Sequence, residues 1–177
     1  MEMSKEGRLL AVAYQEFLKH GYGRVKMHDV AKLAGMSRAA LYLLFSSKEE
    51  LFKRLFADQL TGLLEKIRAA TESAADPPAK LRVAIELWAA SNFDLIKQSP
   101  EASELLDMGL EFSREVFEQK FRDFEALLAT LLPMNTLVEP CLLAHILGSS
   151  LRGLKKTARD ASELRTLIAG LLDQCRL

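Results

Sequence analysis

Asp-Val-Ala-Lys-Leu-Ala-Gly-Met-Ser-Arg-Ala-Ala-Leu-Tyr-Leu-Leu-Phe, residues 29–45, is the stretch that decides the fold of the first part of this chain. It contains two short segments with helical apolar spacing, 28–34 and 38–45, joined by Ala-Gly-Met-Ser. Gly35 permits the left-handed backbone that a tight turn needs, and Ser37 is a favoured N-cap for the second segment. The spacing therefore predicts a helix-turn-helix.

The second segment has an inner and an outer side. Leu41 and Phe45 are one turn apart and are expected to face inward, which turns Ala39, Ala40 and Leu43 outward. Small side chains at the first two of these positions would let the helix backbone approach the edges of bases closely.

Helical patterns also dominate the rest of the chain, which has no alternating pattern typical of strands. A segment over 4–20 ends at Gly21, and the capping box Ser47-Lys48-Glu49-Glu50 opens a long helix to about residue 74. After the Asp76-Pro77-Pro78 boundary, further helices are expected over 80–97, 99–110, 111–132, 141–158 and 164–175. The prediction is an all-α protein of about nine helices.

The net charge of the chain is zero, with 24 basic and 24 acidic residues, but the two signs are unevenly distributed. Residues 1–54 contain ten Lys or Arg and six acidic residues, so the N-terminal part is basic and the remainder is acidic. A basic N-terminal part favours a polyanionic partner. The charge-free runs, such as 140–151, are too short to span a bilayer, and we expect a cytoplasmic protein without membrane contact.

Enzyme chemistry is not indicated. The sequence has three His and two distant Cys without metal-ligand spacing, no phosphate-binding glycine loop and no paired nucleophile and base. We therefore expect no catalytic residues, no metal and no cofactor.

Three groups of residues at fixed spacings carry a resemblance to a known family. They are Phe17-x-x-x-Gly21-Tyr22, Asp29-Val-Ala-x-x-Ala-Gly-Met-Ser37 and Leu41-Tyr-x-x-Phe-x-Ser-Lys-Glu-x-Leu-Phe52. Together they resemble the signature of the TetR family of transcriptional regulators over about residues 6–56. The resemblance implies a helix-turn-helix DNA-binding domain over 4–56, with the motif itself at about 27–46. It implies a regulatory domain over 57–177 for ligand binding and dimerisation.

The function implied by this resemblance is that of a ligand-responsive transcriptional regulator, a repressor. It would bind a near-palindromic operator in double-stranded DNA as a homodimer and be released by a small-molecule effector. The alternative is a protein-interaction module with a degenerate helix-turn-helix. That alternative rests on departures from the family pattern, in which Val25-Lys26 replaces a usual Thr-Thr and Leu44 replaces a usual Tyr or His.

By position in the family pattern, one group of residues is expected to contact DNA, with Arg38 reading a base and Tyr42 and Lys48 contacting phosphates. The expected DNA-binding residues are Lys26, His28, Ser37, Arg38, Ala39, Ala40, Tyr42, Leu43 and Lys48. If Arg38 contacts only phosphate, the apolar side chains of Ala39, Ala40 and Leu43 would have to read thymine methyl groups, or the protein would have to read DNA shape.

Two further sets of residues are hypotheses about the second domain. The expected effector-binding residues are Trp88, Phe93, Met108, Phe112 and Phe117, for which the alternative is an ordinary core. The expected dimer-interface residues are Leu147, Leu151, Leu154, Leu164, Leu167, Ile168 and Leu171, for which the alternative is burial within one protomer.

Overall fold

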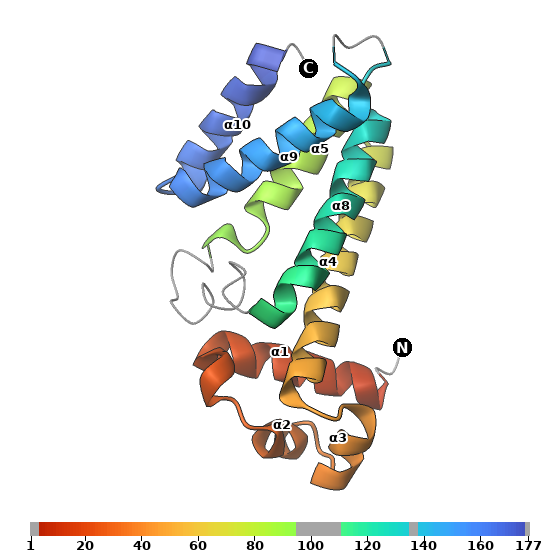
Figure 1. Cartoon of the computed structure of the whole chain (residues 1–177), viewed down its shortest axis with the longest axis vertical. Helices are drawn as coiled ribbons and strands as arrows, with labels where there is room; N and C mark the ends of the chain where they lie inside the picture. The colour runs from red at the N-terminus through yellow and green to blue at the C-terminus, as the bar shows by residue number, and fades with distance from the viewer. Residues whose placement is uncertain (1–3, 95–110, 135–137, 176–177) are drawn as a thin grey trace. The chain divides into compact units, whose positions relative to one another are not determined.

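The computed structural model describes residues 4–94, 111–134 and 138–175, and all regular structure in these ranges is helical. The elements, labelled as in Figure 1, are α1 (Lys5–Arg24), α2 (Met27–Leu33), α3 (Arg38–Leu44), α4 (Lys48–Glu72), α5 (Pro77–Ala90), the 3-10 helix η1 (Glu111–Ser113), α8 (Arg114–Leu131), α9 (Pro140–Thr157) and α10 (Ala161–Cys175). The all-α prediction is confirmed. The helix expected over 99–110 and the last residues of the one expected over 80–97 lie outside the described residues.

The chain divides into two compact units. The first contains the described residues up to 59 together with 111–117, and the second contains 60–94 with the described residues from 118 onward. Helix α4 therefore contributes its first half to the first unit and its second half to the second unit. None of the helices that the structure describes has the length and hydropathy of a membrane span.

The helix boundary predicted at residues 76–78 is observed, whereas the helix end predicted at Gly21 is wrong, because α1 continues to Arg24. Asp76 accepts a hydrogen bond from the Ala79 amide at 2.8 Å and begins α5 directly before two prolines. Gly21, at φ +73°, interrupts the regular helical backbone of α1, which resumes and continues to Arg24.

The capping box predicted at the start of α4 differs in one hydrogen bond from the usual arrangement. At the start of α4 the Ser47 hydroxyl accepts from the Glu50 amide at 3.0 Å, as expected. The Glu50 carboxylate, however, accepts from the backbone amide and the hydroxyl of Ser46, one residue before the cap, at 2.7 and 2.6 Å. The hydrogen bonds from the Ser46 side chain and backbone lower the pKa of Glu50.

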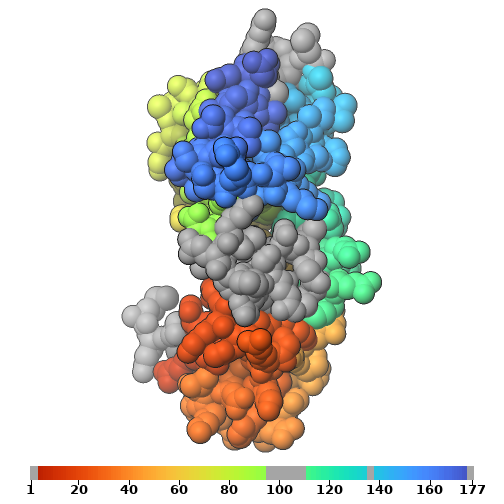
Figure 2. All heavy atoms as spheres, turned by 90° about the vertical axis from the view of Figure 1, so that its left-hand side faces the viewer, coloured from red at the N-terminus to blue at the C-terminus, as the bar shows by residue number. Residues whose placement is uncertain are grey.

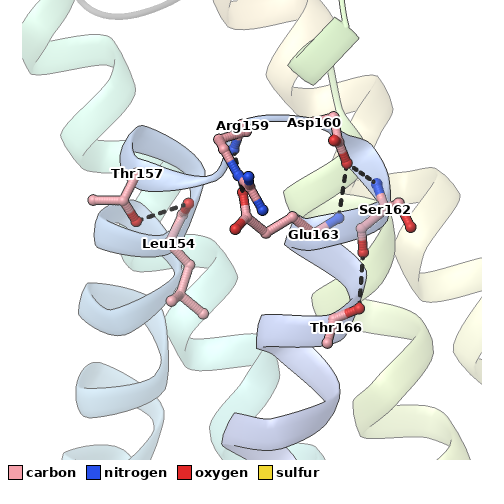
Figure 3. A network of polar contacts seen from close by, with 7 residues as sticks. All are labelled: Leu154, Thr157, Arg159, Asp160, Ser162, Glu163 and Thr166. Atoms are coloured by element: carbon pink, nitrogen blue, oxygen red, sulfur yellow. Dashed lines mark hydrogen bonds and ion pairs between the residues drawn. The ribbon is translucent and has the colours of Figure 1, made fainter.

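The turn between α9 and α10 repeats this arrangement (Figure 3). Asp160 accepts hydrogen bonds from the amides of Ser162 and Glu163, each at 2.9 Å. The Glu163 carboxylate accepts from the Arg159 amide at 2.7 Å and from the Arg159 guanidinium at 2.9 Å. This network fixes the reversal that brings α10 against α9 and α5.

Helix α8, from residue 118 onward, contributes aromatic side chains to the core of the second unit. Its buried side chains Phe121, Phe124 and Leu128 repeat at three and four residues and face the core. The Trp88 ring of α5 stacks on Phe124 with a centroid distance of 4.3 Å and an interplanar angle of 10°. Figure 2 looks onto the side of this unit where α10, in dark blue, lies at the surface.

Candidate nucleic-acid interface

The connection between α2 and α3 has the backbone geometry that its sequence predicts. Gly35 is in the left-handed region at φ +70°, and its amide donates to the Lys32 carbonyl at 3.1 Å. The Met36 amide donates to the Ala31 carbonyl at 3.0 Å, which closes the end of α2. The Ser37 hydroxyl accepts from the Ala40 amide at 3.1 Å and caps α3. The helix-turn-helix is thus formed by local hydrogen bonds.

The inner side of this motif orients α3. Leu41 is completely buried, as is Val30 of α2, and Phe45 at the end of α3 is nearly so. These side chains join the core of the first unit with Phe17 and Leu51. Because α3 has only seven residues, its orientation depends on these contacts rather than on its own stability.

The outer side of α3 carries the residues that we expected to meet DNA. Arg38, Ala39, Tyr42 and Leu43 are exposed, and Ala40 is half-buried. Leu43 is 88% exposed, an unusual state for a large apolar side chain. The Arg38 guanidinium lies 5.4 Å from the centre of the Tyr42 ring, within the range of a cation–π interaction.

Two residues at the start of α2 that we expect to contact DNA are also exposed. Lys26 occupies the N-cap position of α2 and its side chain makes no capping hydrogen bond, which agrees with the loss of the family's usual Thr. His28 lies in the first turn of α2 with its side chain exposed. Contact of these two residues with DNA stays a prediction.

Lys48 has a structural role that the sequence did not reveal. Its ammonium donates to the carbonyls of Tyr22 at 2.7 Å and Val25 at 3.0 Å, with that of Gly23 at 3.5 Å. It also lies 4.3 Å from the centre of the Tyr22 ring. The start of α4 is therefore tied to the end of α1 and to the segment that leads into α2. Lys48 acts here as a positioning residue, and its expected phosphate contact stays a prediction.

An aromatic cluster supports the same end of α1. The Tyr22 ring packs on Phe17 at 5.7 Å, on Phe52 at 5.5 Å and on Phe112 at 5.0 Å. Burial, followed by the negative charge of Glu49, raises the pKa of Tyr22. The family signature includes Phe17, Tyr22 and Phe52 of this cluster, but it gives no indication of Phe112.

The residues expected to bind an effector are not brought together in one unit. Phe112 and Phe117 belong to the first unit, where Phe112 contacts Tyr22 and Phe52, whereas Trp88 and Phe93 are buried in the second. Met108 lies outside the described residues. Because the Phe112 ring packs on Tyr22 and Phe52 of the first unit, effector binding by Phe112 stays a prediction.

Polar contacts surround the Trp88 core of the second unit. The Arg152 guanidinium makes two parallel hydrogen bonds of 3.0 Å to Glu118 and lies 3.6 Å from the centre of the Phe121 ring. Lys155 donates to the Ser91 carbonyl at 3.0 Å, beyond the end of α5. In the part of the chain that the structure describes, no group of His, Cys, Asp and Glu is arranged to hold a metal.

The residues expected at a dimer interface differ in how far their own protomer covers them, and the interface itself stays a prediction. Four of its members are covered by their own protomer, because they form the inward faces of α9 and α10: Leu147, Leu151, Leu164 and Ile168. Leu154 and Leu171 are half-buried and Leu167 is 37% exposed. The large apolar side chains that α9 leaves in solvent are Leu142, 53% exposed, and Ile146, 44% exposed.

Gly148 lies on the side of α9 that faces α8. A Cβ atom there would lie 2.9 Å from the tip of Phe121 and 2.9 Å from a carboxylate oxygen of Glu125. Gly148 therefore serves the packing of α9 on α8 within the protomer.

Comparison with known proteins agrees with this geometry. The family model described as bacterial regulatory proteins of the tetR family matches residues 9–55. The chain is 31% identical over 102 residues to the HTH-type transcriptional activator FasR of Mycolicibacterium smegmatis, a match that covers 58% of this chain and 45% of that protein. It is 33% identical over 79 residues to the HTH-type transcriptional repressor KstR2 of Mycobacterium tuberculosis, covering 45% and 40%. The matches thus span less than half of each relative.

Similarity in three dimensions extends further along the chain. The transcriptional regulator FadR of Bacillus subtilis, solved in complex with stearoyl-CoA, superimposes with a TM-score of 0.68 over 95% of this chain and 96% of that one. The sequence identity is 16%, so this likeness concerns the fold.

Proposed function

We propose that this chain, whose residues 9–55 match the tetR family model, is a ligand-responsive transcriptional repressor of that family that binds operator DNA. The observation that carries the proposal is the outer side of α3. Its cap and turn are satisfied internally, its inner residues are buried, and Arg38, Ala39, Tyr42 and Leu43 are left in solvent. A helix held in this way can enter the major groove with its side chains directed at base edges.

Charge supports DNA as the partner. Between residues 24 and 46 the chain has four Lys or Arg and one acidic residue, Asp29. Lys26, Lys32 and Arg38 are exposed, so they are available to phosphates. The interaction would occur in the cytoplasm, where a bacterial regulator meets the chromosome.

Homodimerisation is the second part of the proposal. We assign the interface to the apolar side chains that α9 and α10 leave exposed, with Leu142, Ile146 and Leu167 at its centre. Exposed apolar side chains on two neighbouring helices suit a symmetric four-helix contact. Two helix-turn-helix units would then bind the two halves of a near-palindromic operator.

The effector is the third part. The aromatic core around Trp88 and Phe124 in the second unit is the apolar environment from which a site between helices would be built. Trp88 is the only tryptophan, so its emission reports on this core directly. Stearoyl-CoA, bound by the Bacillus subtilis regulator of similar fold, is a first compound for a titration panel.

A mobility-shift experiment tests DNA binding. The full chain is mixed with the DNA upstream of its own gene and with a shuffled duplex of equal length and composition. We expect a shift of the upstream DNA at concentrations that leave the shuffled duplex free, and a smaller preference for the upstream DNA in Arg38→Ala. A chain that binds neither duplex, or both equally, would favour the protein-interaction module instead. A promoter reporter then separates repression from activation.

A further inference from the structure

The outer side of α3 is divided into three rows of side chains, because residues four positions apart lie one above the other on a helix. The rows are Arg38 with Tyr42, Ala39 with Leu43, and Ala40 with Leu44. Only the first row contains hydrogen-bonding groups. The other two are entirely apolar, although Ala39, Leu43 and Leu44 are exposed.

The polar row is gathered along one edge of the helix. The Arg38 guanidinium lies 5.4 Å from the Tyr42 ring centre, so the two polar side chains lie beside each other along one edge of the helix. One guanidinium can read one guanine through its O6 and N7 atoms. Hydrogen bonding from α3 is therefore too limited to specify a half-site of several base pairs.

The two apolar rows expose large side chains to solvent. Leu43 is 88% exposed, and Leu44 at the end of α3 is 43% exposed. Large apolar side chains gathered at a surface indicate a binding site. The surrounding charge identifies the partner as a polyanion, since residues 24–46 contain four Lys or Arg and a single acid.

We propose that Ala39, Ala40 and Leu43 specify thymine through its 5-methyl group, so that each operator half-site contains thymine at two or more positions beside the base that Arg38 contacts. The 5-methyl of thymine is the apolar group that a base edge offers in the major groove. A side chain without donors or acceptors gains free energy there only by covering that methyl, and it leaves the polar atoms of other bases without partners. This inference rests on the proposed function and names the class of sequence that the repressor recognises.

The test starts from DNA of unknown sequence. The full chain selects from a random library of 30-base-pair duplexes, and the enriched duplexes are synthesised twice, once with thymidine and once with deoxyuridine in its place. Deoxyuridine has the same hydrogen-bonding groups and lacks only the methyl. We expect the enriched sequence to carry thymines in both halves, and the deoxyuridine form to bind about fourfold more weakly for each methyl that is buried.

Two variants assign the effect to α3. Leu43→Ala should reduce the ratio between the two dissociation constants, because the side chain that covers a methyl has been shortened. Leu33→Ala removes the same atoms from an exposed leucine on α2 and should leave the ratio as it is in the unsubstituted chain. Circular dichroism establishes that both variants are folded.

The outcomes are distinguishable. If no sequence is enriched, the proposed function itself fails. If a sequence is enriched but binds equally well with thymidine and deoxyuridine, the repressor stands and the reading of thymine methyls is wrong. If the penalty for deoxyuridine is the same in Leu43→Ala as in the unsubstituted chain, the methyls act through DNA shape and the assignment to Leu43 is overturned.

Discussion

The ammonium of Lys48 lies 2.7 Å from the carbonyl oxygen of Tyr22, a residue 26 positions earlier in the chain. This hydrogen bond joins the first residue of α4 to the end of α1, and the ammonium is also bonded to the carbonyl of Val25 just before α2. The geometry of the helix-turn-helix thus depends on a cation that the sequence suggested for DNA alone.

Replacing Lys48 should therefore change stability as well as affinity. Hydrogen bonds to a charged group contribute about 1.5–3 kcal/mol, and partial exposure places Lys48→Ala at the lower end of this range. We expect its Tm to fall by about 3–6 °C in a thermal melt. Lys26→Ala is the matched control, because that exposed lysine makes no capping hydrogen bond. It should weaken DNA binding without a change in Tm; an unchanged Tm in Lys48→Ala would contradict the structural role.

Phe112 should stabilise the first unit. Its ring packs on Tyr22 at 5.0 Å and on Phe52 at 5.8 Å, and such aromatic pairs add about 0.5–1.5 kcal/mol each beyond the area they bury. Phe112→Ala should accelerate amide hydrogen exchange in residues 22–25, whereas Phe112→Leu should retain part of the protection. Equal exchange in all three proteins would show that the contact is dispensable.

Monomers should result from charges placed on the exposed faces of α9 and α10. In Ile146→Glu combined with Leu167→Glu, two carboxylates would have to enter a dry interface, while in a monomer both remain in water. Sedimentation velocity should show half the mass with unchanged helical content. Leu151→Glu should instead unfold the second unit, because Leu151 is completely buried in the protomer. A double variant that still sediments as a dimer would place the interface elsewhere.

Alanine substitutions at Gly148 and at Gly62 should change the free energy of unfolding in opposite directions. At Gly148 the new methyl would meet the buried tip of Phe121 at 2.9 Å, and overpacking of this kind costs about 1–3 kcal/mol. At Gly62 in α4 nothing lies within 4 Å, so the higher helix propensity of alanine should raise stability by up to about 1 kcal/mol. Urea unfolding of the two variants measures the difference, and stabilisation by Gly148→Ala would refute the close packing of α9 on α8.

Alanine substitutions at Arg38 and Lys26 should distinguish a base contact from a phosphate contact. Arg38→Ala should cost about 1–3 kcal/mol at the selected operator and much less on random DNA. Lys26→Ala should weaken both by a similar factor and reduce the dependence on salt by about one counterion. If Arg38→Ala leaves the ratio of specific to random binding intact, its guanidinium contacts phosphate only.

The sequence by itself determined the features that depend on residues within a few positions of each other. The left-handed Gly35 and the Ser37 cap on α3 could both be predicted, because each is a backbone or capping preference closed by neighbours three to five residues away. The outward face of α3 followed in the same way, since a single buried Leu41 sets the rotation of a seven-residue helix.

Only the tertiary structure decided which of two similar faces is buried and which distant groups meet. Helix α9 has leucine or isoleucine on both sides, so its periodicity did not separate the buried Leu147 and Leu151 from the exposed Leu142 and Ile146. Their burial is decided by packing against α5 and α8. Phe112 and Lys48 gave the same difficulty, because both contact the end of α1 across many intervening residues. The physical reason is that local preferences choose the helices, whereas burial depends on the shape of surfaces that exist only once the helices have packed.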